Sequence, residues 1–352
     1  MEFTGSRLAP YLKAAWSWLP TRVQKAVAGI ELRTASFPST YYDPAVHPSR
    51  LDRGAVVISV DLEMAWAWQH RIAPSIDFVR MGLWERAQMP RLLRALDSYG
   101  IPATWFTVGH LFLDRCTRGS DGRAHAEVPQ LPPGHYRSYR LNAGDWFQND
   151  PCTDVHRDSA WYAPDLVEMV LKSPVAHEFG SHTFSHTYFG PPCSHMVAAS
   201  EMQAANDAMA RFGVKPESFS FPRSSEGNFE SIAKAGIRIV RAFTGRRAIL
   251  SLPVLRSDGL WVVDSATAFD RGARWSLEQR LARLKKFAEA AAQERLAFHM
   301  FMHPSLSEEE MNSIFVPFVA HCAQLRERGV LDVVTVRDLV ALTRERKAPH
   351  AA

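Results

Sequence analysis

Val56-Val57-Ile58-Ser59-Val60-Asp61-Leu62-Glu63 is an apolar, β-branched run that ends in two carboxylates. Such a run, bounded by Gly54 and by the acidic pair, predicts a strand. Asp61 and Glu63 are two residues apart, so on an extended strand both side chains point the same way. Two carboxylates aimed at one place repel each other unless a cation or a proton separates them. The stretch therefore predicts either a metal site or a solvated acidic strand end.

Three further apolar runs lead into polar side chains, namely those before His182-Thr183-Phe184-Ser185-His186, Pro222-Arg223 and His303-Pro304. Helical patterns separate seven or eight such runs, and this alternation predicts an α/β chain with a parallel sheet. In a βα barrel the active site is built at the carboxyl ends of the strands. A doubly wound open sheet is the alternative, but the chain has no Gly-rich phosphate loop. We therefore expect a distorted (β/α)7-8 barrel with parallel strands.

The chain divides into an N-terminal helical extension (residues 1–50), the barrel (51–345) and a short tail (346–352). Within the barrel, a segment from about 114 to 160 is rich in Pro, Gly, Asp and Arg. Loops this long in a compact domain are usually functional or disordered, and we expect a lid or a groove wall. The extension carries two short amphipathic segments with basic residues. These segments predict either helices packed on the barrel or a peripheral contact with a membrane surface.

Composition limits the classes of function. The chain has 352 residues, of which 46% are hydrophobic and 22% charged, with a net charge of +4 and no Lys/Arg block. We therefore expect no nucleic-acid partner. No stretch approaches the ~18 apolar residues of a transmembrane helix. Four scattered cysteines without a C-x-x-C pair indicate free thiols. The N-terminus lacks the features of a signal peptide, so we expect a cytoplasmic protein, with the inner membrane surface as a potential contact.

His182 and His186 are four residues apart, so on a helical turn or a loop both imidazoles can face one ion. Two imidazoles and one carboxylate leave a position open for water, as in catalytic zinc sites. H-x-x-x-H also arises by chance in a chain with 14 histidines. The preceding stretch, Ala176-His177-Glu178-Phe179-Gly180-Ser181, makes the pattern more specific.

Arg223 and His303 each allow two readings. A guanidinium at a strand end can hold a carboxylate in position, but Arg223 can equally form a surface salt bridge. The imidazole of His303 can pass a proton to a leaving amine, or it can be a hydrogen-bonded core histidine.

The order and wording of these pieces resemble the polysaccharide deacetylase family, also called the NodB-homology or carbohydrate esterase family four fold, over about residues 55–340. The resemblance implies a set of roles: Asp61 as base, Glu63, His182 and His186 as metal ligands, Arg223 as the arginine that steadies the base, His303 as proton donor and Asp264 as the aspartate that tunes it. Where many members carry adjacent aspartates this chain has Asp61-Leu62-Glu63, and Thr187 replaces a usual proline.

The resemblance implies a metal-dependent N-deacetylase that removes an N-acyl group from an amino sugar. The wording of Ala103-Thr-Trp-Phe and Phe221-Pro-Arg is similar to a subgroup associated with bacterial cell-surface polysaccharide loci, so a surface polysaccharide or its precursor is the implied substrate. The implied cofactor is a divalent metal, Zn²⁺ before Co²⁺, Ni²⁺ or Mn²⁺. Candidates to stack on sugar rings, or alternatively to pack in the core, are Trp66, Trp68, Trp105 and Trp146.

Two other functions remain open. One is a metal-independent, allantoinase-like amidohydrolase, because some relatives depart from the family pattern at the acidic pair. The other is a catalytically silent saccharide-binding or envelope-assembly protein.

Overall fold

The structure, a computed structural model, describes residues 49–70, 77–136, 141–242, 250–264, 267–269 and 275–347. The predicted N-terminal extension and its membrane contact lie almost entirely outside these residues, as does most of the predicted tail. None of the helices within the described ranges combines the length and the apolar character that a membrane span requires.

One sheet organises the fold around β1 (Gly54–Leu62), in which every residue is buried. β1 pairs in parallel with β2 (Thr104–Thr107), β12 (Ala297–Met302) and β13 (Leu331–Val334). Beyond β2 the sheet continues in parallel through β5 (Glu178–Ser181), β6 (Ser218–Ser220), β7 (Ile239–Arg241) and β10 (Trp261–Val263). The sheet curls into a half-barrel, which confirms the predicted α/β fold with mostly parallel strands.

The margins of the sheet carry short strands. β9 (Val254–Leu255) is antiparallel to β10, and β8 (Leu250–Ser251) is antiparallel to β12. β11 (Thr267–Ala268) pairs in parallel with β12. Burial on both faces is the reason why β1 reads as a continuous apolar run and not as an alternating one.

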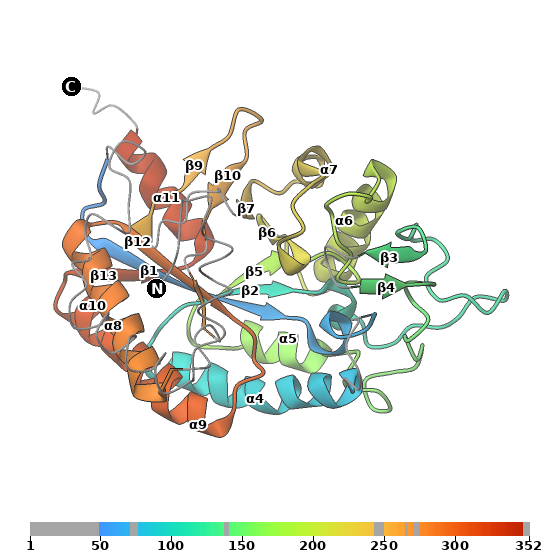
Figure 1. Cartoon of the computed structure of the whole chain (residues 1–352), viewed down its shortest axis with the longest axis horizontal. Helices are drawn as coiled ribbons and strands as arrows, with labels where there is room; N and C mark the ends of the chain where they lie inside the picture. The colour runs from blue at the N-terminus through green and yellow to red at the C-terminus, as the bar shows by residue number, and fades with distance from the viewer. Residues whose placement is uncertain are drawn as a thin grey trace, which may run out of the picture.

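Helices cover the sheet (Figure 1). In that view α4 (Phe78–Ser98) and α5 (Pro164–Leu171) run below the strands, while α8 (Leu277–Glu294) and α10 (Val316–Glu327) lie at the left. At the right and top are α6 (His195–Ala210), α7 (Phe229–Lys234) and α11 (Val336–Lys347). Side-chain caps begin several of them. A capping box at Ser307 opens α9 (Glu308–Glu310), which a π-helical turn (Met311–Phe315) joins to α10.

The predicted insertion, residues 114–160, contains little regular structure in its described part. Its β3 (Gly134–Tyr136) and β4 (Leu141–Ala143) form an antiparallel hairpin, which lies beside α6 at the right of Figure 1. The remainder consists of turns, with an isolated bridge between Arg115 and Asp154. Side-chain contacts must therefore hold most of this segment on the barrel.

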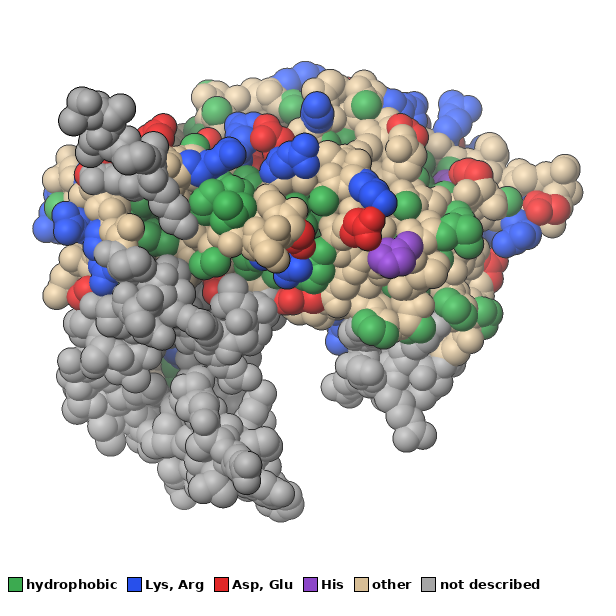
Figure 2. Space-filling view, turned by 90° about the horizontal axis from the view of Figure 1, so that it is seen from above, with side chains coloured by type: hydrophobic (Ala, Val, Ile, Leu, Met, Phe, Trp, Pro, Cys, Tyr) green, Lys and Arg blue, Asp and Glu red, His purple; other side chains and the backbone are tan. Residues whose placement is uncertain are grey.

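The face drawn in Figure 2 carries Lys and Arg side chains interspersed with Asp and Glu, and apolar side chains are scattered between them. This mixing of signs agrees with a small net charge spread over the chain. It gives this face no basic stripe of the kind that follows a nucleic-acid backbone.

Close approach of β1 to α8 gives a test of the fold. A Cβ added at Gly54 would lie 2.1 Å from the carbonyl oxygen of Ala291 and 2.5 Å from the Cα of Ala292. Both obstacles are backbone atoms, so the helix must shift. We expect Gly54→Ala to lower the free energy of unfolding by about 1–3 kcal/mol in a denaturant titration. Gly144→Ala, whose Cβ would meet only a side-chain oxygen at 3.7 Å, is the control and should stay near wild type. Equal stability of the two variants would contradict this packing.

Candidate active site

Four strands deliver polar side chains to one edge of the sheet, and a fifth delivers a backbone carbonyl. β1 ends at Leu62 between Asp61 and Glu63, β5 runs into His182, β7 ends at Arg241 and β12 runs into His303. β6 ends at Ser220, which contributes a backbone carbonyl. Because these strands are parallel, their carboxyl ends meet at the same edge.

Glu63 lies at the centre of this group. Its Oε1 is 2.8 Å from Nε2 of His182 and 3.1 Å from Nε2 of His186, and its Oε2 is 3.6 Å from Nε2 of His303. Burial opposes ionisation of Glu63. The charges of His186 and His303 and the close contacts with the imidazoles of His182 and His186 outweigh burial and hold the pKa of Glu63 well below its usual range. The three predicted ligands therefore converge on one point, although 119 residues separate Glu63 from His182.

A loop, not a helical turn, brings the two histidines together. Thr183 and His186 have φ values of 64° and 62°, in the left-handed region that non-glycine residues seldom occupy. Glu201 of α6 holds this loop, because its Oε2 accepts the N–H groups of Phe184 and Ser185 at 2.9 Å each. The side-chain oxygen of Ser185 lies 2.6 Å from Oε1 of the same carboxylate. Such a bent loop needs supporting contacts that an i, i+4 pattern does not reveal.

The glycine that precedes His182 in the sequence motif, Gly180, has a structural reason. A Cβ at this position of β5 would lie 2.6 Å from the ring of Phe106 and 2.6 Å from the side-chain oxygen of Ser218. Only glycine allows β2, β5 and β6 to approach this closely, so His182 leaves the sheet at a fixed place.

Asp61 pairs with an arginine that the sequence analysis did not select. Nη1 of Arg241 lies 2.7 Å from Oδ1 of Asp61, and Nη2 lies 2.5 Å from Oδ2. This bidentate geometry fixes the plane of the carboxylate. Arg223 is instead exposed, in a short 3₁₀ turn with a left-handed φ of 48°. The structure therefore corrects the assignment of Arg223 as the partner of the base: the guanidinium comes from the end of β7, the next strand of the sheet.

Behind Arg241 a hydrogen-bonded chain leads into the core. Nη1 of Arg241 donates to the hydroxyl of Ser59 at 2.9 Å, and this hydroxyl lies 2.8 Å from Nε2 of His299. Nδ1 of His299 lies 3.0 Å from the backbone carbonyl of Asp264, which can only accept. Burial, reinforced by the charge of Arg241, lowers the pKa of His299 to about 3. A neutral His299 therefore orients Ser59 and, through it, Arg241.

His303 is the most accessible member of the centre, with a side chain that is 31% exposed. One ligand atom each from Asp61, Glu63 and His303 lies within 4.8 Å of the others. The predicted base and the predicted acid can therefore flank one reacting carbon.

Glu85 of α4 is a further buried carboxyl group near the centre, and it accepts the backbone N–H of Met64 at 2.9 Å. Burial, opposed by the charge of His303 and reinforced by that of Glu63, raises the pKa of Glu85 to about 8. It is therefore protonated at neutral pH and adds no second negative charge beside Glu63. Nothing in the helical pattern of α4 marks this residue from sequence alone.

The remaining sequence candidates lie elsewhere. Asp264 reaches His299 through its backbone carbonyl, so this contact does not make it the partner of His303. The side chains of Trp66, Trp105 and Trp146 are 1%, 0% and 2% exposed, so these rings cannot stack on a sugar. Trp146 instead donates its indole N–H to the carbonyl of Ser185 at 3.0 Å and so braces the histidine loop. Trp68 alone of the four is partly exposed.

The donor set fits a divalent cation. Nδ1 of His182 lies 2.8 Å from the carbonyl oxygen of Ser220, so this nitrogen carries the hydrogen. In a neutral ring the lone pair at Nε2 then faces Oε1 of Glu63 at 2.8 Å, and a second imidazole nitrogen approaches the same oxygen. Acceptors this close repel unless an extra proton or a cation lies between them. A backbone carbonyl that fixes the tautomer in this way is typical of metal-bound histidines.

His299 gives a pH prediction. Its pKa of about 3 in the folded chain lies below the ordinary value of 6.5, so the unfolded chain binds a proton that the folded chain does not. The contribution to stability is complete above pH 6.5 and is lost as the pH falls from 6.5 towards 3, by up to about 1.4 kcal/mol per pH unit. Denaturant titrations of wild type and His299→Gln over this range should differ in slope, with the variant less sensitive to acid. Parallel curves would contradict the neutral state of His299.

Comparisons with known proteins agree with this geometry. The family model described as polysaccharide deacetylase matches residues 81–240, a range that contains both histidines of the centre, while Asp61, Glu63, Arg241 and His303 lie outside it. No curated protein matches the chain.

Two solved structures share the fold. A candidate polysaccharide deacetylase from Mycobacterium smegmatis is 14% identical, with a TM-score of 0.58, and the match covers 88% of this chain and 95% of the other. A second such structure, from Pseudomonas aeruginosa PAO1, is 11% identical, with a TM-score of 0.56 and coverage of 83% and 91%. At these identities the likeness concerns the fold alone. The family match is to a polysaccharide deacetylase domain over residues 81–240, and the shared fold is consistent with it.

Proposed function

We propose that this protein is a metal-dependent N-deacetylase that hydrolyses an N-acyl group of an amino sugar in a surface polysaccharide or its precursor. The observation that carries the proposal is the convergence of His182 and His186 on one oxygen of Glu63, beside Asp61 and within reach of His303. Three donors with an adjacent acid–base pair are the requirements of hydrolysis at a metal that keeps a position open for water.

Each side chain has a separate task. Glu63, His182 and His186 would hold the ion, which when bound supplies a Lewis acid that activates water and polarises the substrate carbonyl. Asp61 accepts the proton of the attacking water, and its bidentate pair with Arg241 keeps its oxygens aimed at the reacting atoms. His303, the most exposed of the set, donates a proton to the departing nitrogen.

Asp61 and Glu63 can take different roles, as base and as metal ligand, because each carboxylate has its own basic neighbour. Asp61 has a guanidinium and Glu63 has imidazoles. A donor set built for a metal also favours this proposal over the metal-independent amidohydrolase. An acid and a base within 4.8 Å of a shared carboxylate favour it over a silent binding protein, which needs neither.

The first test distinguishes the role of Asp61 as the base from the role of His182 as a metal ligand. Acetate release from N-acetylglucosamine and N-acetylgalactosamine oligomers is measured together with metal content by elemental analysis. Asp61→Asn should lower kcat by about 10²–10⁴-fold while metal stays bound, because proton transfer is lost and the ligands are intact. His182→Ala should remove the metal of this centre together with turnover. Chelation should inactivate the wild type, and Zn²⁺ should restore it. Near-normal turnover by Asp61→Asn, or full activity after chelation, would contradict the proposal.

A pair of arginine variants tests the partner of the base. Arg241→Lys removes the bidentate geometry and should lower kcat by about 10–100-fold, since a hydrogen bond to a charged group contributes about 1.5–3 kcal/mol. Arg223→Lys is the matched control and should behave as wild type, because Arg223 is exposed and the guanidinium on Asp61 belongs to Arg241. The reverse ranking in a steady-state assay would restore Arg223 to the role implied by the sequence.

A further inference from the structure

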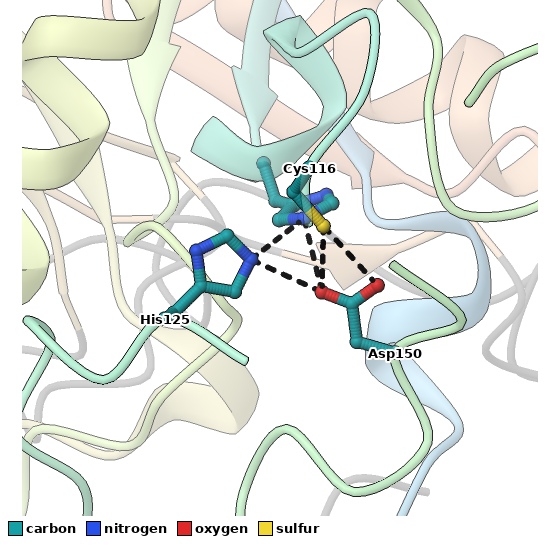
Figure 3. A group of neighbouring side chains, drawn as sticks. Cys116, His125 and Asp150 are labelled. Carbon is teal, nitrogen blue, oxygen red and sulfur yellow. Dashed lines mark hydrogen bonds and ion pairs between the residues drawn. The ribbon is translucent and has the colours of Figure 1, made fainter. Parts of the chain in front are cut away.

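A second group of metal-type donors lies outside the Glu63 centre. It consists of His110, in the 3₁₀ turn Gly109–Phe112 after β2, with Cys116, His125 and Asp150 of the insertion. One ligand atom from each lies within 4.8 Å of the other three. Cys116, His125 and Asp150 point towards one another from separate stretches of loop (Figure 3). His110 and Asp150 are fully buried, and His125 is nearly so.

Four of the six distances between donor atoms match the edges of a tetrahedron around one small cation, and the other two lie within 4.8 Å. Nε2 of His110 lies 3.2 Å from Nε2 of His125, and these atoms are 3.2 and 3.1 Å from Oδ2 of Asp150. Sγ of Cys116 lies 3.4 Å from the same oxygen. With zinc–nitrogen and zinc–oxygen bonds of about 2.0–2.1 Å and a zinc–sulfur bond of about 2.3 Å, tetrahedral geometry requires edges of roughly 3.3 Å, and roughly 3.5 Å where sulfur takes part.

The protons available to these groups cannot satisfy all of those contacts. Nδ1 of His110 lies 3.2 Å from the backbone carbonyl of Trp161, so the hydrogen of a neutral ring sits there and Nε2 presents a lone pair. That lone pair faces an oxygen of Asp150, which is also an acceptor. A hydrogen on Nε2 of His125 can be donated to Nε2 of His110 or to Oδ2 of Asp150. The contact between Nε2 of His110 and Oδ2 of Asp150 then still has no hydrogen between its two acceptors. A cation at the middle removes the conflict.

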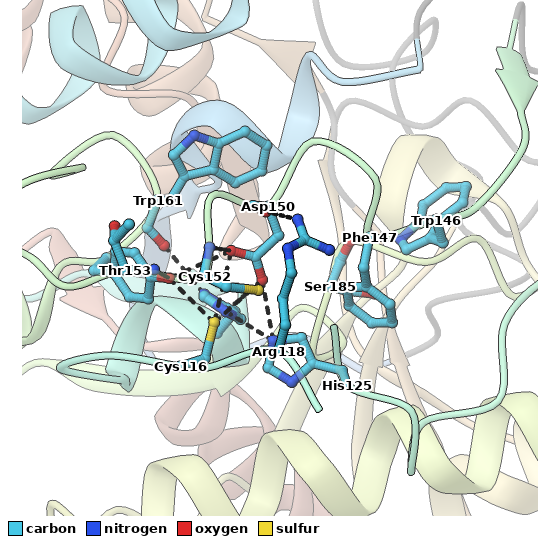
Figure 4. Close-up of polar contacts among 12 residues, drawn as sticks. Cys116, Arg118, His125, Trp146, Phe147, Asp150, Cys152, Thr153, Trp161 and Ser185 are labelled. Atoms are coloured by element: carbon cyan, nitrogen blue, oxygen red, sulfur yellow. Dashed lines mark hydrogen bonds and ion pairs between the residues drawn. The ribbon is translucent and has the colours of Figure 1, made fainter. Parts of the chain in front are cut away.

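The surrounding groups hold the donors in place (Figure 4). Oδ1 of Asp150 accepts the backbone N–H of Cys152 at 2.9 Å and lies 3.3 Å from the hydroxyl of Tyr162. Its Oδ2 is thereby left to the cluster. The same hydroxyl lies 3.1 Å from Sγ of Cys116, within reach to stabilise a thiolate. Supporting hydrogen bonds of this kind accompany metal ligands in proteins.

We propose that His110, Cys116, His125 and Asp150 bind one zinc ion that fastens the insertion to the barrel. A soft thiolate, two imidazoles and one carboxylate oxygen suit zinc, and four protein ligands close the coordination shell, as in structural sites. The site is separate from the Glu63 centre, which has no sulfur ligand and supplies its own three donors.

Such an ion would explain how a segment with little regular structure keeps its place. Three of the four ligands belong to the insertion, and the fourth follows a central strand of the sheet. Trp146 lies between His125 and Asp150 in the sequence. Its indole N–H donates to the backbone carbonyl of Ser185, inside the loop that carries His182 and His186. Phe147 contacts His125, with the ring centres 4.9 Å apart. The zinc would thereby support the wall of the hydrolytic centre without entering the reaction.

An ion also has a route to the cluster. A cavity of about 640 Å³ is lined by Cys116 and His125 from the cluster and by Glu127, with α6 residues on its other side. Nδ1 of His125 lies 3.6 Å from the exposed carboxylate of Glu127, so this side chain can orient the imidazole from the solvent side.

Cobalt(II) substitution of the full chain tests the proposal without reference to activity. A thiolate bound to Co²⁺ gives an intense sulfur-to-metal charge-transfer absorption in the near ultraviolet, which nitrogen and oxygen ligands do not give. We expect this band in the wild type and in His182→Ala, and its loss in Cys116→Ala. Cys193→Ala is the matched control, because Cys193 is a free, half-buried thiol outside the cluster, and it should keep the band. If His182→Ala loses the metal of the Glu63 centre but keeps the band, the two sites bind metal independently.

A measurement on the wild type covers the case in which Cys116→Ala does not fold. Alkylation followed by peptide mapping should find Cys116 protected in zinc-loaded protein and labelled after chelation, whereas Cys193 should be labelled equally in both. Cobalt-loaded wild type without the band, a band that persists in Cys116→Ala, equal labelling of Cys116 with and without zinc, or a disulfide between Cys116 and Cys152 would each overturn the proposal.

Discussion

The registers of β1 against its neighbours set the geometry of the centre. Asp61 pairs with Phe106 of β2, and Val60 pairs with Met302 of β12, so the residues after these strands emerge side by side. Parallel pairing then brings His182 and Arg241 to the same edge from β5 and β7. A shift of β1 by one residue would turn the side chain of Asp61 to the opposite face of the sheet, because side chains alternate between the two faces along a strand. Burial of β1 on both faces makes that shift costly.

Charge is divided at this edge so that two carboxylates can serve different purposes. Asp61 lies in a bidentate pair with Arg241, and Glu63 lies among imidazoles that hold its pKa low. Two neutral buried groups stand behind them: Glu85, whose pKa is raised to about 8, and His299, whose pKa is lowered to about 3. Keeping these two groups uncharged leaves the charges of the centre on the side chains that face a substrate. Distinct surroundings for neighbouring carboxylates are how one site separates its acid–base roles.

The strands could be predicted from the sequence because each apolar run is buried on both faces and bounded by polar residues. Convergence of Glu63, His182 and His186 followed from the same rule. Arg241 was not predicted, because an arginine at the end of β7 carries no sequence feature that sets it apart from Arg223 after β6. For the four tryptophans the sequence left core packing and sugar stacking open, because aromatic residues serve both and periodicity does not distinguish them, and the structure buries three of the four.

The second cluster could not be predicted for a different reason. Its ligands lie in irregular loops with spacings that match no zinc motif, and they meet only in the folded chain. The two clusters resemble each other in one respect: a backbone carbonyl fixes the tautomer of a buried histidine in each, Ser220 for His182 and Trp161 for His110. In both clusters a lone pair directed at a carboxylate is an arrangement that a bound cation would satisfy.

The central claim is that Glu63, His182 and His186 hold a divalent ion beside Asp61. Crystals of the full-length protein grown with zinc, with diffraction recorded on both sides of the zinc absorption edge, test it most directly. We expect an anomalous peak about 2.0–2.2 Å from Nε2 of both histidines and from Oε1 of Glu63. A zinc-replete crystal with these three side chains ordered and no peak among them would contradict it.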